Sequence, residues 1–158
     1  MADNKTIRIR GVQDVQRSLK KLGQTSRQSR TAINKALRPA ANMLARGIQQ
    51  AYKSEVNTYS GIKSGRTPTW KTIGIVTARK SRQPGLFVGP IKRRTTPITV
   101  KGKDSYNLAA MQIKGNAIQK PRENVFKATA IKMESQIYLK AEEDLDKLLD
   151  KMIKQAGF

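Results

Sequence analysis

The side chains with which this chain could do chemistry are few, and their types argue against an enzyme. Its 158 residues include no histidine and no cysteine. This removes the usual zinc ligands, the histidine-based triads and the commonest general base. A two-carboxylate mechanism would rest on Asp104 and Glu123, the only acidic residues between positions 60 and 130. The sequence therefore predicts no catalytic residue, no metal site and no cofactor.

The abundant functional groups are cations. Lys and Arg number 32 against 11 Asp and Glu, a net charge of +21, which attracts polyanions or acidic protein surfaces. Residues 60–130 hold 15 basic and two acidic residues. We expect two basic groups at the tips of the strands in this region, where they would contact a partner or DNA: Arg79, Lys80, Arg82, Lys92, Arg93 and Arg94.

The acidic residues gather near the end of the chain. Six of the 11 lie between positions 134 and 150, among lysines on the exposed side of a predicted helix. A solvated role is the simplest interpretation. The alternative is that one subunit offers this acidic stretch to the basic middle of a neighbouring subunit.

Two helical patterns precede the basic middle. Apolar residues at steps of three and four from Val12 to Leu22 predict a helix, with Gly23 as its C-cap. A second, alanine-rich pattern runs from about Ser29 to Tyr52 and predicts a helix whose apolar side belongs to the core. Pro39 interrupts it, so we expect a kink or break near residues 37–38.

The middle of the chain is predicted to form β-strands. Residues 57–68 are rich in turn formers and predict a flexible loop. A short helix is expected from Asp104 or Ser105 to Ile113. Between them, three apolar runs predict a hairpin or small antiparallel sheet: residues 70–78, 85–91 and 97–100.

A long amphipathic helix is predicted at about residues 125–154, with Asn124 as its N-cap. It would be roughly 45 Å long, which exceeds what a small domain needs to cover its own core. We therefore expect it to pack against other chains as well. Its apolar positions are spaced by three or four: Phe126, Ala130, Met133, Ile137, Ala141, Leu145, Leu148 and Met152.

These elements predict an α+β fold in a single domain, residues 1–158. We expect a small antiparallel β-sheet with the N-terminal helices packed on it and a long C-terminal amphipathic helix. The opening MADNKTIRIRG has no apolar run, so no secretory signal is expected. No apolar run approaches the ~18 residues of a membrane span, so no membrane association is expected.

The order of the motifs resembles the neck, or tail-completion, proteins of long-tailed bacteriophages, of the lambda-like head–tail joining type. The motifs cover nearly the whole chain. In order they are IRIRGVQDVQRSLKKL, INKALRPAANMLARGIQQAYK, TYSGIKSG, LFVGPI, YNLAAMQIKG and QKPRENVFKATA.

In that family a proline–arginine–aromatic stretch precedes the last helix, and the resemblance implies that it anchors the helix to the subunit. The comparable residues here are Pro121, Arg122, Phe126 and Ala130, and the apolar positions Ile137, Leu145, Leu148 and Met152 complete the expected anchor and interface. The family's glutamate before the glycine of the short helix is missing, because this chain has Gln112, Ile113 and Lys114 there.

The function implied by the resemblance is structural. Copies of the chain would form a ring, a hexamer or alternatively a dodecamer, around the channel that DNA crosses between head and tail. Its partners would be the portal or connector proteins on one side and the tail-tube proteins on the other, with nonspecific contact to genome DNA. The expected location is the virion neck, and the host cytoplasm during assembly.

Two other classes of function stay open. The basic surplus also fits a nucleic-acid-binding accessory protein, although the stacking aromatics of a specific module are sparse. A nuclease with a carboxylate-bound magnesium ion is the weakest alternative, because it depends on Asp104 and Glu123 alone.

Overall fold

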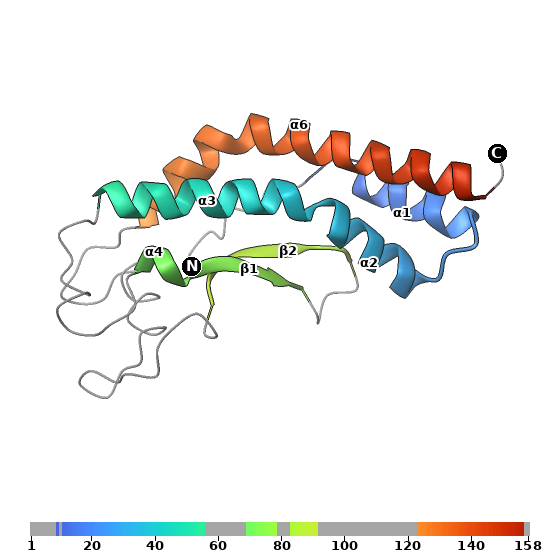
Figure 1. The fold of residues 1–158 in the computed structure, drawn as a ribbon, viewed down its shortest axis with the longest axis horizontal. Helices are drawn as coiled ribbons and strands as arrows, with labels where there is room; N and C mark the ends of the chain where they lie inside the picture. The colour runs from blue at the N-terminus through green and yellow to red at the C-terminus, as the bar shows by residue number, and fades with distance from the viewer. Residues whose placement is uncertain (1–8, 10, 56–68, 79–82, 92–122, 157–158) are drawn as a thin grey trace. The chain divides into compact units, whose positions relative to one another are not determined.

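The computed structural model describes residues 9, 11–55, 69–78, 83–91 and 123–156 (Figure 1). It confirms the α+β class: helices dominate, and the two described strands form a small sheet. The elements in chain order are α1 (Val12–Lys21), α2 (Ser26–Ala36), α3 (Arg38–Glu55), α4 (Thr69–Thr72), β1 (Ile73–Thr77), β2 (Leu86–Pro90) and α6 (Glu123–Gln155).

The contacts within the chain divide it into two compact units. The first comprises Met1–Ala41, Thr77–Phe87 and Glu134–Phe158, and the second comprises Asn42–Val76 and Val88–Met133. The helices α3 and α6 each contribute residues to both. Each unit is described by itself below.

The first unit is built around an apolar cluster shared by α1, α2 and the later part of α6. Val15, Leu19, Ile33 and Leu145 are buried there, with Leu148 and Met152 among the partly buried side chains packed against them. Figure 1 shows α1 beside the red end of α6. Three amphipathic helices thus cover one another's apolar sides.

Local signals fix the ends of α1 and α2. Gly23 has a φ of 81°, and the backbone N–H groups of Gly23 and Gln24 donate to the carbonyls of Lys20 and Leu19. This is a Schellman motif, so the predicted glycine C-cap is confirmed. At the start of α2, Thr25 and Gln28 form a capping box, which places the helix start three residues before the predicted Ser29.

The predicted break before Pro39 is confirmed. The helix α2 ends at Ala36, Leu37 forms a turn, and α3 begins at Arg38. Proline lacks the N–H that would continue the helical ladder, although Ala41 N–H still reaches the Leu37 carbonyl at 3.1 Å. The alanine-rich pattern is therefore two helices in sequence.

In the second unit, α3 approaches the first part of α6 closely. A side-chain carbon added at Gly47 would overlap the sulfur of Met133 and lie 3.6 Å from Cγ2 of Thr129. The space beside Gly47 is therefore filled by the flexible end of Met133, which leaves no room for a large side chain at this position.

The strands are tied to the helices by two side-chain hydrogen bonds. In the first unit, the backbone N–H of Gly85 donates to Oδ1 of Asn34 at 2.8 Å. In the second, Nε2 of Gln49 donates to the carbonyl of Ile73 at 2.8 Å. Each helix thereby satisfies a backbone group at or beside a strand.

Two sequence predictions need correction. Trp70, Lys71 and Thr72 were expected to begin a strand, but they form the short helix α4. Asn124 was expected to cap the long helix, but the helix already includes Glu123. The predicted loop at residues 57–68, the third strand at 97–100 and the short helix to Ile113 lie outside the described residues.

Candidate protein interaction site

The helix α6 is the longest element, with 33 residues, and its later part has two apolar-bearing sides. One side faces the chain's own core. We call Ile137, Ala141, Leu145, Leu148 and Met152 the inner stripe. The first three are buried, with Leu145 2% exposed, and the last two pack against the first unit's cluster.

The opposite side carries what we call the outer stripe: Leu139, Glu142, Asp146, Asp150 and Ile153. These positions recur at steps of three, four, four and three, so they lie within about 80° of one another around the helix axis. All five are exposed, and Leu139 is 68% exposed. Among the described residues its three carboxylates make no ion pair. The outer stripe is thus an acidic, partly apolar face open to solvent.

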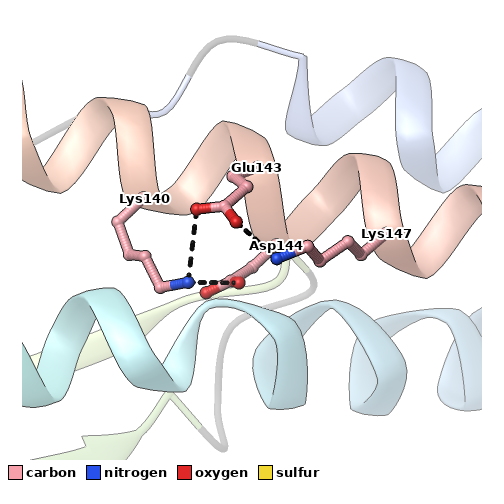
Figure 2. Close-up of polar contacts among 4 residues, drawn as sticks. All are labelled: Lys140, Glu143, Asp144 and Lys147. Carbon is pink, nitrogen blue, oxygen red and sulfur yellow. Dashed lines mark hydrogen bonds and ion pairs between the residues drawn. The ribbon is translucent and has the colours of Figure 1, made fainter.

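A polar network occupies the flank of α6 between the two stripes (Figure 2). Nζ of Lys140 donates to Oδ1 of Asp144 at 2.8 Å and to Oε2 of Glu143 at 3.4 Å, and Nζ of Lys147 donates to Oε1 of Glu143. Pairs three and four residues apart lie side by side on a helix, so this network supports α6 locally.

The network shifts two titrations. Hydrogen bonds from Lys147 and then Lys140 hold the pKa of Glu143 below its ordinary value. The hydrogen bond to Asp144 is the main cause that raises the pKa of Lys140. The ionised forms of Glu143 and Lys140 are therefore both favoured near neutral pH. Their charges neutralise each other and not the carboxylates of the outer stripe.

The predicted anchor lies only partly within the described residues. Pro121 and Arg122 are outside them, whereas Phe126 is half-buried and Ala130 is buried. The predicted interface positions belong to the inner stripe: Ile137 and Leu145 are buried by the chain itself, and Leu148 and Met152 are partly buried by it. The outer stripe is the exposed side of the later part of α6 and so a candidate surface for an intermolecular contact. The sequence pattern did not reveal that stripe, because its two apolar residues stand at its ends with three acids between them.

The predicted basic tips, Arg79, Lys80, Arg82, Lys92, Arg93 and Arg94, all lie outside the described residues. The described cations instead show two other groupings. On α1 and α2 the exposed cations include Lys20, Lys21, Arg27 and Lys35.

In the second unit, the ammonium groups of Lys53 and Lys71 lie 5.3 and 5.4 Å from the ring centroid of Trp70. These are cation–π distances. Exposed apolar side chains also occur on the strands, at Val76 and Phe87.

In the part of the chain that the structure describes, no three His, Cys, Asp or Glu side chains are grouped so that they could hold a metal ion. Likewise, no described helix has the length and apolar character needed to cross a membrane. Comparison of the chain with protein-family models, curated proteins and solved structures gives no match. The site is therefore interpreted from its own geometry.

Proposed function

We propose that the chain is a structural protein of the neck of a tailed bacteriophage, where copies form a ring that joins head to tail around the DNA channel. The ring would contact portal or connector proteins on one side and tail-tube proteins on the other. The order of the sequence motifs is the origin of this proposal.

The observation that supports it best is the outer stripe of α6. A helix of 33 residues that covers its own core with one side still leaves Leu139 and Ile153 in water on the other side. The two apolar side chains stand about 21 Å apart at the ends of a stripe whose middle is three acids, and an amphipathic helix face of this kind can be covered by another protein. A protein that works as part of a ring needs such a surface.

The proposal is tested in the virus that encodes the chain. Deletion of the gene should leave filled heads and complete tails that do not join, and antibody labelling of whole particles should mark the head–tail junction. Joined, infectious particles from the deletion, or the protein's absence from purified particles, would contradict the proposal.

A basic nucleic-acid-binding accessory protein is the second candidate, favoured by the net charge of +21 and by the lysines beside Trp70. It predicts duplex or RNA binding that weakens steeply as salt rises, because binding releases counterions from the phosphates. Weak binding with no dependence on salt would remove this candidate.

A further inference from the structure

The outer stripe and the cations of α1 and α2 belong to the same unit but face different directions. The inner stripe of α6 packs against α1 and α2, and the outer stripe is on the other side of α6. The side chains of Glu142, Asp146 and Asp150 therefore point away from the cations of their own α1 and α2. These acids are therefore placed to pair with cations of another molecule.

The net charge also differs between the later part of α6 and the rest of the chain. Residues 134–155 contain six acidic and four basic residues, a net charge of −2, so the other residues together carry +23. A second copy of the chain thus offers the outer stripe a surface of opposite sign. Complementary charges of this kind direct two molecules into one orientation.

The described cations that best match the stripe are on α2. Arg27 and Lys35 are both exposed and lie two helical turns apart, on the side of α2 away from the buried Ile33. Lys20 and Lys21 at the end of α1 are exposed as well. The aliphatic stems of such side chains can cover an apolar residue while their charged ends pair with acids.

We infer that the outer stripe of one copy docks on the basic outer side of α1 and α2 of a second copy. Leu139 and Ile153 lie against the stems of the lysines and arginines, and the three acids pair with their charged ends. Two different surfaces meet, so the contact is heterologous and can repeat from copy to copy until a ring closes. The inference rests on the ring assembly of the proposed function and assigns its interface.

The test is sedimentation of the full chain in low salt, where surface charges are least screened. The variant Glu142→Lys/Asp146→Lys should lower the association constant roughly tenfold or more, because like charges then face each other. The variant Arg27→Glu/Lys35→Glu should do the same. Both pairs are exposed, and circular dichroism checks that the fold is kept.

A mixture of the two variants gives the decisive arm. In each variant alone, the outer stripe and the α1–α2 surface carry charges of the same sign. In the mixture, the basic stripe of the first variant can pair with the acidic α2 of the second, and the unchanged stripe of the second can pair with the unchanged α2 of the first. Association should therefore return in the mixture, in assemblies that alternate the two variants. The matched control compares Arg27→Glu with Arg46→Glu, which makes the same charge change at an exposed position on α3, outside the proposed contact, and should not weaken association.

Several outcomes would overturn the inference. They are a wild-type chain that stays monomeric at the highest concentration reached, variants that associate like the wild type, and a mixture that does not recover. Protection of Leu139 by a different neck protein instead of a second copy would also overturn it. Each of these results would leave the proposed neck function unaffected. If instead copies associate through the outer stripe but the protein is absent from virus particles, only the neck function would be refuted.

Discussion

The two stripes of α6 share the same helical turns and differ in what they contact. The inner stripe is apolar and is buried or partly buried by the chain, whereas the outer stripe combines two exposed apolar residues with three acids. A continuous apolar stripe indicates packing within the molecule. A stripe of acids with an apolar residue at each end stays soluble before assembly and still offers charged and apolar surface to a partner. One side of the later part of α6 is therefore used for packing within the chain, and the other is left to solvent.

The largest expected effect is on the free energy of unfolding, and it should differ between the two stripes. Leu145→Ala removes a side chain that is 2% exposed in the cluster of the first unit and should lower the free energy of unfolding by about 2–5 kcal/mol. Leu139→Ala makes the same chemical change on the outer stripe and should alter it by less than about 0.5 kcal/mol. Urea denaturation of both variants measures the difference. Equal losses would contradict the division into two stripes.

A second variant extends the comparison to the second unit, where Met133 of α6 faces Gly47 of α3. Gly47→Leu has no room beside Met133 and Thr129 and should cost about 1–3 kcal/mol of unfolding free energy. Gly47→Ala is the control, because the flexible end of Met133 can move and alanine favours the helix by up to about 1 kcal/mol. Thermal unfolding distinguishes the two, and a fully stable Gly47→Leu variant would exclude close packing here.

A third variant tests whether a buried polar group in the core of the first unit has a hydrogen-bond partner. Ser29 on α2 is fully buried, and its hydroxyl has no hydrogen-bond partner among the described residues. Ser29→Ala should therefore stabilise the protein by about 1 kcal/mol, because an unpaired buried hydroxyl is lost and alanine is the better helix former. The exposed Ser26→Ala is the control in the same denaturation assay. A clear loss of stability in Ser29→Ala would reveal a hydrogen bond to this hydroxyl.

The smallest effect concerns the polar flank between the stripes. Because the pKa of Glu143 is lowered in the folded chain, its ionised form stabilises the fold above the ordinary value of 4.5, and this is lost as pH falls through the lowered pKa. Because the pKa of Lys140 is raised, its contribution is present below 10.5 and is lost as pH rises through the raised value. Stability should decline at both ends of this window.

Glu143→Gln isolates the acidic end of that dependence. The variant should show a weaker fall in stability on acidification than the wild type, measured by denaturation across a series of pH values. The effect should be smaller than that of any core variant, because the network is largely solvated. Identical pH profiles would mean that the network contributes nothing to folding.

Much of the fold could be predicted where one local rule decides the outcome. Gly23 ends α1 because glycine tolerates a positive φ, and Pro39 separates α2 from α3 because proline lacks an N–H. The long helix was placed almost correctly by its apolar spacing. Trp70 and Thr72 were wrongly assigned to a strand, because a short apolar run does not by itself distinguish helix from strand.

The candidate site was less predictable. The apolar spacing found the inner stripe but could not say that the same chain would cover it, since that depends on how α1 and α2 pack. Leu139 and Ile153 stand among acids and looked like ordinary surface residues. The i,i+4 pairs of Lys140 with Asp144 and of Glu143 with Lys147 could have been read from the sequence.

The central claim is that the outer stripe is covered by another copy when the protein assembles. Because the chain has no cysteine, Leu139→Cys introduces a single thiol whose maleimide labelling rate reports this directly. We expect rapid labelling in dilute, salt-dissociated protein and strong protection in the assembled state, while Arg46→Cys, an exposed control on α3, reports general reactivity. Labelling of Leu139→Cys at the same rate in both states would contradict the claim.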